Sequence, residues 1–176
     1  MPFKYKDVSD LSDTELLCKN STLDLFPLET ESSALSCQTS KNDVQTGEAG
    51  EFLTISKLLK WGYKASPVSS GHAYDIVVED AKGRLLRIQV KTSSTLKSRY
   101  SFSFVRGFYY SPKGNFDYAN DDYDISACVN LHDEKVLFSA GVEKSISWKR
   151  DQFMRENYEK SSWENACSEI NKGAKQ

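Results

Sequence analysis

Apolar and polar positions follow a helical spacing in one part of the chain and a strand-like alternation in the next. Residues 46–62 read TGEAGEFLTISKLLKWG, in which apolar side chains recur at intervals of three and four. This spacing predicts an amphipathic helix with Thr46 as its N-cap and Gly62 as its stop. The side chains expected on its buried stripe are Phe52, Ile55, Leu58 and Leu59.

Two strand-like runs follow this helix, YDIVVE (residues 74–79) and RLLRIQVKT (residues 84–92). The residues between them, Asp80–Gly83, end in a glycine, which suits a hairpin turn whose last residue is left-handed. The register then follows by counting from the turn. It pairs Ile76 with Ile88, Val78 with Leu86 and Tyr74 with Val90 on one apolar face, and Asp75 with Gln89 on the other.

This hairpin predicts a polar cluster. Gln89 and Lys91 lie two residues apart, so they share one strand face at a separation of about 7 Å, and Asp75 lies on that same face. An amide and an ammonium group are not buried on a strand face without polar partners. Glu51 stands four residues before Ile55, on the inward stripe of the helix, and is placed to join the cluster.

Three later segments also have strand character, and with the hairpin they predict a mixed sheet of four to six strands. They are residues 98–105, 123–131 and 134–140. Two helices are expected to close the chain. One lies around Trp148–Asn157, and the other begins after Ser161, where Glu164 completes the spacing of a capping box.

The N-terminal part has a different character. Residues 28–43 are polar, rich in Ser and Thr and without a sustained period, which predicts a linker. Ahead of it, Ser12 and Glu15 have capping-box spacing and indicate one short helix. We therefore expect an acidic, partly flexible arm and linker over residues 1–45 and one folded domain over residues 46–176.

The composition of the chain indicates the cellular compartment in which the protein is expected. The 176 residues include four widely spaced cysteines without a CxxC pair, which argues against a disulfide scaffold or a zinc site. The first residues lack the apolar core of a signal peptide, and no run approaches the length of a membrane span. We expect a cytoplasmic protein with reduced thiols and no membrane partner.

Charge is distributed unevenly along the chain. The net charge is −2, but residues 1–45 hold four basic and eight acidic side chains, so the remainder is net positive. No acidic residue occurs between Asp80 and Asp117, and a basic stripe fills this interval. It consists of Lys82, Arg84, Arg87, Lys91, Lys97, Arg99, Arg106 and Lys113. Such a stripe can pair with nucleic-acid phosphates, although taken alone it is equally typical of a solvated face.

The polar cluster favours a particular chemistry. Two carboxylates and an amide oxygen suit a hard cation such as Mg²⁺ or Mn²⁺. A lysine beside the ion can hold the attacking water and neutralise charge that develops on a phosphate. These are the parts of a phosphodiester hydrolase. The structural alternative for Glu51 is an ordinary ion pair with Lys57 or Lys91. If Glu51 does not belong to the cluster, Glu48 is the other helix carboxylate that could take its place.

The cluster resembles the motif of the PD-(D/E)xK nuclease superfamily, which is a helix glutamate, a strand aspartate and then an acid-x-lysine on the next strand. The matching residues are Glu51 in GEAGE, Asp75 in AYDIVVED, and Gln89 with Lys91 in RIQVK. The likeness covers residues 46–94 and is greatest to small intron-encoded homing endonucleases of cyanobacterial type, and more distant to archaeal Holliday junction resolvases. It implies an α/β fold with a restriction-endonuclease-like αβββαβ core, in which helices flank a central mixed sheet.

The resemblance also implies a function. It indicates a Mg²⁺-dependent endonuclease, with Mn²⁺ as a substitute, that cuts double-stranded DNA as a homing-type, site-specific enzyme of a mobile element or phage. Glu51, Asp75 and Gln89 would hold the metal and, with Lys91, form the catalytic set. Cutting both strands implies a homodimer or homotetramer in a bacterial or phage-infected cell. The alternatives are a Holliday junction resolvase and an inactive nucleic-acid-binding module of the same fold.

One position departs from the superfamily pattern, because Gln89 stands where Glu or Asp is usual. A neutral amide weakens the attraction for a cation and favours one tightly held ion over two. The homing-endonuclease branch also uses glutamine there.

Further candidates for DNA contact lie in the loop before Asp75 and in the basic stripe. They are Ser69, Ser70, His72, Lys97, Arg99, Arg106 and Lys113. Each has a plainer alternative as a loop or surface residue. The aromatic residues around Pro112 fit a loop that enters a DNA groove and equally one that covers a hydrophobic edge or forms a subunit contact.

Overall fold

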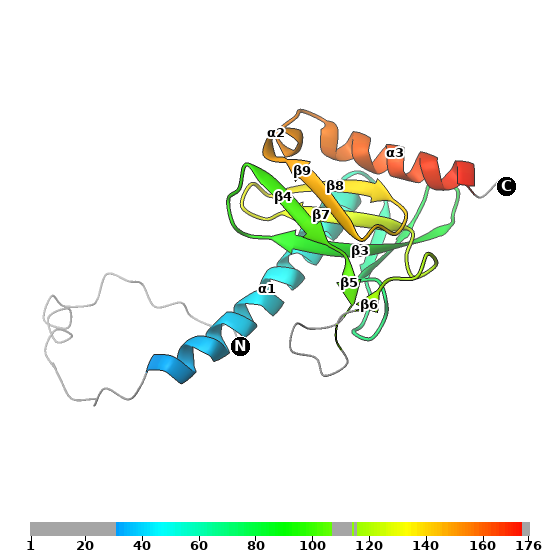
Figure 1. Ribbon diagram of the computed structural model, residues 1–176. Helices are drawn as coiled ribbons and strands as arrows, with labels where there is room; N and C mark the ends of the chain where they lie inside the picture. Colours follow the sequence, from blue (N-terminus) through cyan, green and yellow to red (C-terminus); the bar gives the residue numbers. More distant parts are fainter. Residues whose placement is uncertain (1–30, 107–113, 115, 174–176) are drawn as a thin grey trace, which may run out of the picture. The chain divides into compact units, whose positions relative to one another are not determined.

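The computed structural model describes residues 31–106, 114 and 116–173, and its side chains from residue 43 onward. The chain divides at Ser36, and the fold and the site lie in the second unit, Cys37–Gln176. The centre of that unit is a five-stranded sheet in the order β1-β2-β3-β7-β8. Its strands are β1 (Lys64–Pro67), β2 (Ile76–Glu79), β3 (Leu85–Ser93), β7 (Ile125–Asn130) and β8 (Lys135–Ala140). Figure 1 labels three of these strands, β3, β7 and β8. β3 and β7 run parallel and the other neighbours antiparallel, so the predicted mixed sheet is confirmed.

One face of the sheet packs against the first helix, α1 (Glu31–Lys60). Leu86, Ile88 and Val90 of β3 point into this main core, where they join Ile55 and Leu58 of α1. Alternate residues of a strand point to opposite faces, so Gln89 and Lys91 are turned away from that core. The alternation along β3 therefore places its polar side chains as the sequence predicts.

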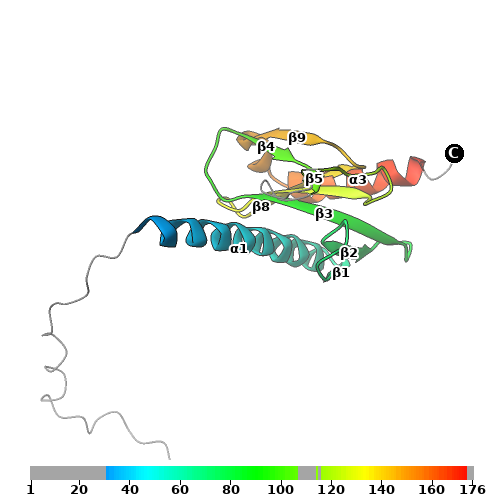
Figure 2. The ribbon, with the colours of Figure 1, turned by 60° about the horizontal axis from the view of Figure 1, so that its bottom comes forward.

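The opposite face is covered by a two-stranded ribbon, β4 (Arg99–Ser103) and β9 (Ser145–Lys149), and by the short helix α2 (Arg150–Phe153). Figure 2 shows α1 and the ribbon on opposite sides of β3. The side chains of this second core are Tyr100, Phe102, Phe104, Tyr123, Cys128, Leu137, Ile146 and Phe153. A further small pair, β5 (Val105–Arg106) and β6 (Phe116–Asp117), lies between β4 and β7 in the chain. In the expected αβββαβ order, a helix connects the third strand to the next one. In the structure, the described part of the connection between the parallel strands β3 and β7 contains short strands and no helix.

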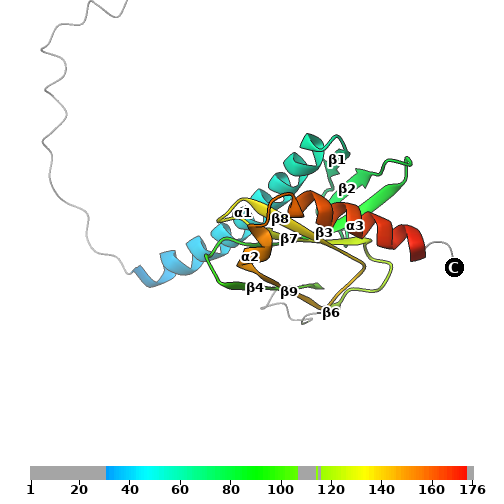
Figure 3. The ribbon, with the colours of Figure 1, turned by 90° about the horizontal axis from the view of Figure 1, so that it is seen from above.

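The last helix, α3 (Tyr158–Gly173), runs beside the edge strand β8 (Figure 3). Glu159 accepts a hydrogen bond from the backbone N–H of Val136, and the hydroxyl of Ser162 accepts one from that of Phe138. These two donors point away from β7 and would otherwise be unpaired at the sheet edge. Side chains of α3 therefore close this edge.

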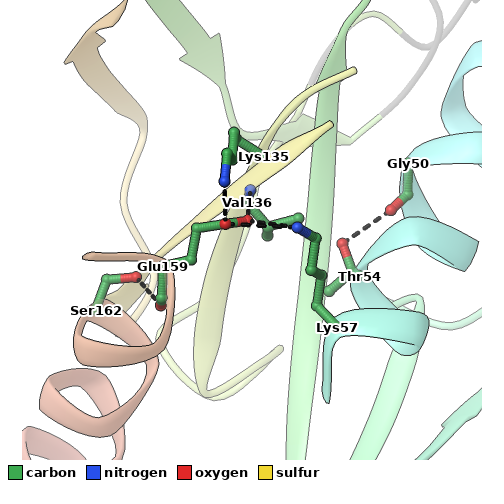
Figure 4. Close-up of polar contacts among 7 residues, drawn as sticks. All are labelled: Gly50, Thr54, Lys57, Lys135, Val136, Glu159 and Ser162. Carbon is green, nitrogen blue, oxygen red and sulfur yellow. Dashed lines mark hydrogen bonds and ion pairs between the residues drawn. The ribbon is translucent and has the colours of Figure 1, made fainter. Parts of the chain in front are cut away.

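Glu159 also connects α3 to α1. Its carboxylate lies 3.2 Å from Nζ of Lys57 and 2.9 Å from Nζ of Lys135 (Figure 4). The side chain of Glu159 is only 12% exposed, so both ion pairs are partly shielded from water. One carboxylate thus holds two helices and an edge strand together.

The structure confirms the hairpin and corrects some of its neighbours. Ile76 pairs with Ile88 and Val78 with Leu86, as predicted, and Gly83 is left-handed with φ of 78°. The prediction for Tyr74 was wrong. The pairing of β2 with β3 begins only at Ile76, and Tyr74 packs against the second core.

The helix predictions need larger corrections. α1 begins at Glu31, so part of the expected linker is helical, and Thr46 is an interior residue of the helix instead of its N-cap. Phe52 and Leu59 are 62% and 53% exposed, because the buried stripe of α1 is narrower than predicted. No helix among the described residues is long and apolar enough to cross a membrane.

The closing helices also differ in their bounds. Trp148 belongs to β9, and the helix after it, α2, has only four residues. α3 begins at Tyr158, so Ser161 is not an N-cap. Its hydroxyl instead donates to the carbonyl of Asn157, one turn earlier.

Candidate active site

The candidate site lies at a notch in the sheet, where β2 leaves β3. The ladder between them starts at the pair Ile76 and Ile88, whereas β3 continues to Ser93 with β7 as its partner. Asp75 stands at this fork, and its Oδ2 accepts a 2.7 Å hydrogen bond from the backbone N–H of Val90. The carboxylate therefore takes over a donor that β2 would have paired had it continued.

Gln89 fixes the same carboxylate from its side chain. Its Nε2 donates hydrogen bonds to Oδ2 of Asp75 at 2.6 Å and to the carbonyl of Val90 at 3.2 Å. The side chain is 5% exposed, and both N–H groups of the amide are used. Neither Oδ1 of Asp75 nor Oε1 of Gln89 accepts a hydrogen bond from the described residues. These two oxygens remain available as ligands.

The approach of α1 to β3 brings the third member of the cluster. A Cβ built on Gly50 would lie 1.9 Å from Oγ1 and 2.9 Å from Cβ of Thr92, so the helix can pass this close only with glycine at that position. Glu51 follows Gly50 in α1, and Lys91 precedes Thr92 in β3. The close contact between backbone and side chain thus places the helix glutamate beside the end of β3.

A pocket of about 500 Å³ opens at this place. It is lined by all four predicted residues, Glu51, Asp75, Gln89 and Lys91. The rest of the wall is rich in hydroxyl groups and consists mainly of Thr46, Thr92, Ser93, Ser94 and Thr95. The residues that the motif brought together in sequence therefore share one cavity.

Electrostatics make Asp75 the centre of the cluster. Burial, the charge of Asp75 and the charge of Glu48 raise the pKa of Glu51 to about 7. Burial also raises the pKa of Asp75, although the Val90 N–H and the Lys91 charge oppose it, and burial lowers the pKa of Lys91 against the opposing charge of Asp75. Burial is thus the main cause of all three shifts, and neighbouring carboxylates add to the shift of Glu51.

The donor set fits a hard divalent cation. Asp75 Oδ1, the Glu51 carboxylate and Gln89 Oε1 belong to residues that line the pocket, and Mg²⁺ prefers such oxygen ligands. No group of three or more His, Cys, Asp or Glu residues suited to a metal occurs in the part of the chain that the structure describes. The set depends on the glutamine for its third oxygen. Lys57 pairs with Glu159, so the alternative of a Glu51–Lys57 ion pair does not hold.

The loop before Asp75 borders the site. Ser69, Ser70 and His72 line a second pocket of about 520 Å³, whose wall also includes Glu51 and Asp75. All three loop side chains belong to exposed residues. The structure therefore brings these predicted contact residues to the rim of the candidate site.

The basic stripe divides into two groups. Arg84, Arg87 and Arg106 are tied to acidic residues, Asp80, Asp124 and Asp122, at 3.1, 3.0 and 3.7 Å respectively. These arginines hold loops in place, and Arg106 lies apart from both pockets. Lys97 and Arg99 instead line a separate pocket with Lys149 and Arg150. Lys113 and most of the aromatic loop lie outside the described residues.

Sequence reasoning missed several residues at the site. Thr92 to Thr95 follow Lys91 directly, and this run of four hydroxyl-bearing residues was a usable signal. Tyr118 comes from a distant segment, and burial together with the charge of Asp75 raises its pKa to about 12. Nothing in the spacing around Tyr118 pointed to this neighbour.

Comparison with known proteins identifies the class. A family model described as PD-(D/E)XK endonuclease matches residues 41–172, so the chain belongs to this endonuclease family. Among solved structures, the bacterial homing endonuclease I-Ssp6803I is similar, with a TM-score of 0.55 and 22% sequence identity over 75% of this chain and 95% of that one. At this identity the likeness shows a shared fold. A search of curated protein sequences found no match.

Proposed function

We propose that the protein is a divalent-metal-dependent endonuclease that hydrolyses phosphodiester bonds in double-stranded DNA. The observation that carries the proposal is the convergence of Glu51, Asp75, Gln89 and Lys91 on one open pocket in a member of an endonuclease family. Three carboxylates, those of Asp43, Glu51 and Asp75, and one lysine line this pocket, a charge balance that a cation would correct.

Each side chain has a role in this proposal. Asp75, Glu51 and Gln89 hold the cation, and the hydrogen bond between Gln89 and Asp75 fixes the direction of both. Lys91 orients the attacking water and neutralises charge on the phosphate as it reacts. A bound Mg²⁺ would supply a Lewis acid and make its water more acidic, and Mn²⁺ would serve in its place.

We further propose a homing-type, site-specific enzyme that acts as a homodimer or homotetramer. The support is the resemblance of the motif to homing endonucleases, including its glutamine, and the shared fold with a bacterial enzyme of that kind. Two sites are needed to cut both strands, and a two-fold assembly favours pseudo-palindromic targets.

The test is a cleavage assay on a duplex library with a randomised central segment, beside a four-way junction. We expect cleavage of duplex DNA with Mg²⁺ or Mn²⁺ and none with EDTA. Asp75→Asn should abolish cleavage, and Asp117→Asn, at an exposed carboxylate on β6, should leave it unchanged. Cutting of the junction alone would favour a resolvase. DNA binding without cleavage by the wild type would favour an inactive module.

A further inference from the structure

The β4–β9 ribbon has an outer face of unusual composition. Side chains alternate along both strands, and those turned inward build the second core. Those turned outward all belong to exposed residues and comprise Arg99, Ser101 and Ser103 on β4 and Ser145, Ser147 and Lys149 on β9. The outer face therefore consists of four serines and two cations, with no acidic and no bulky apolar side chain.

The cations occupy an unfavourable place. Arg99 and Lys149 are direct partners in the antiparallel register, and like charges directly opposite each other destabilise a strand pair. Neither side chain forms a salt bridge with the residues that the structure describes. Such a pair gains from an anion that bridges it, and a DNA phosphate is an anion of this kind.

A basic pocket lies at this end of the ribbon. It has a volume of about 610 Å³, and Lys97, Arg99, Lys149 and Arg150 supply its charge against the single acid Asp151. Arg150 is engaged by Asp133, so Lys97, Arg99 and Lys149 are the cations available to a ligand. Residues 91–95 line the candidate active site and residues 96–99 line this pocket, so the two cavities are joined by one continuous segment.

We infer that the β4–β9 ribbon enters the DNA major groove and reads base edges with its serine hydroxyls, while Arg99 and Lys149 hold the flanking phosphates. This inference rests on the proposed function and names the surface that selects the substrate. A two-stranded ribbon fits the width of the major groove, and serine can donate to or accept from any base pair there. Small side chains allow the backbone of the ribbon to approach the bases closely.

The test measures affinity for the duplex library in the presence of Ca²⁺ with Ser147→Glu and its matched control Ser168→Glu, an exposed serine of α3. We expect Ser147→Glu to weaken binding at least about tenfold through repulsion of the phosphates, and the control to bind as the wild type does. The double variant Ser101→Ala/Ser147→Ala should keep affinity for random DNA and change the selected target sequence at adjacent base pairs. Arg99→Ala should reduce the salt dependence of binding by about one phosphate contact.

The outcomes separate this inference from the proposed function. If the wild type cleaves DNA and the Ser147→Glu and Ser168→Glu variants bind it with equal affinity, the inference about the ribbon is overturned and the proposed nuclease function stands. An unchanged target sequence in the serine double variant would overturn base reading. A wild type that neither binds nor cuts duplex DNA would overturn the proposed function and the inference with it. Near-ultraviolet and far-ultraviolet circular dichroism of each variant identifies any loss of folding.

Discussion

The side-chain amide of Gln89 donates a 2.6 Å hydrogen bond to Oδ2 of Asp75, which also accepts the backbone N–H of Val90. Both donors bind the same carboxylate oxygen, so the other oxygen, Oδ1, accepts no hydrogen bond from the described residues. A carboxylate at position 89 could not donate in this way. Gln89 is therefore more than a neutral replacement for an acidic residue, because its amide donor orients Asp75.

Gln89→Ala should abolish metal-dependent cleavage and leave DNA binding intact. The substitution removes one proposed metal ligand and the donor that orients Asp75, whereas the proposed DNA-contacting surfaces are unchanged. Cleavage is measured on plasmid DNA with Mg²⁺, and binding by fluorescence anisotropy. Cleavage by the variant at the wild-type rate would show that Gln89 has no role in the catalytic site.

Gln89→Glu should make the fold depend on a cation. The new carboxylate would face Oδ2 of Asp75 across a contact that is 2.6 Å in the native protein, and two like charges at that distance repel each other. In EDTA the melting temperature of the variant should lie below that of the wild type. Mg²⁺ should raise the melting temperature of the variant by more than it raises that of the wild type. Equal shifts with Mg²⁺ in both proteins would contradict the proposed metal set.

Gly50→Ala should lower the free energy of unfolding by about 1–3 kcal/mol, because the added methyl group meets the short side chain of Thr92 and forces α1 away from β3. Gly47→Ala is the matched control. It lies in the same helix with no atom within 4 Å of the added Cβ, so it should be neutral or stabilising by up to about 1 kcal/mol. Urea unfolding of both variants makes the comparison. Equal stabilities would show that the close contact is absent in solution.

Glu159→Ala should destabilise the protein by about 2 kcal/mol or more, since it leaves the N–H of Val136 without an acceptor and Lys57 and Lys135 without a counter-charge. Glu159→Gln keeps an acceptor and should cost less. The control is Glu164→Ala on the same helix, whose exposed pair with Lys160 should contribute less than about 0.5 kcal/mol. Thermal unfolding ranks the three variants, and an equal loss for Glu159→Ala and Glu164→Ala would contradict the role of Glu159.

The ion pair of Asp133 with Arg150 should set part of the acid limit of stability. Two hydrogen bonds from Arg150 and one from Asn130 lower the pKa of Asp133 from 3.8 to about 2. A folded-state pKa below the unfolded value gives stability that is complete above pH 3.8 and is lost as the pH falls through about 2. Asp133→Asn should flatten this part of the pH–stability curve. Asp121→Asn, at an exposed residue, should leave it unchanged.

The positions of the candidate site residues could be predicted from the sequence more accurately than the bounds of the helices. The hairpin register depended on a short turn with one glycine in its left-handed position, and local counting placed Asp75 near Gln89, to which it is hydrogen-bonded just before the ladder begins. Glu51 was placed from its distance to Ile55 and Leu58, both of which are buried. Local periodicity and the hairpin register therefore predicted that these four residues lie close together, as they do in one pocket.

Other features depend on contacts that the sequence does not display. The start of α1 at Glu31 was missed because Ser- and Thr-rich segments have no apolar period to mark a helix. Phe52 fits the helical spacing but is exposed, because the neighbouring elements cover only part of that face. The pairing of β4 with β9 joins segments more than forty residues apart, and no local pattern indicates it. Tertiary packing decides such features.

The closure of β8 by Glu159 and Ser162 restricts how copies of this chain can associate. A two-fold assembly that extends one sheet into its neighbour needs a free outermost strand, and α3 already occupies the donors of β8. Within the described sheet, this leaves β1, which carries Lys64 at one end and the non-donating Pro67 at the other. Sheet-to-sheet fusion is therefore disfavoured at both borders of the five-stranded sheet, and subunits would have to meet through side chains on helices or loops.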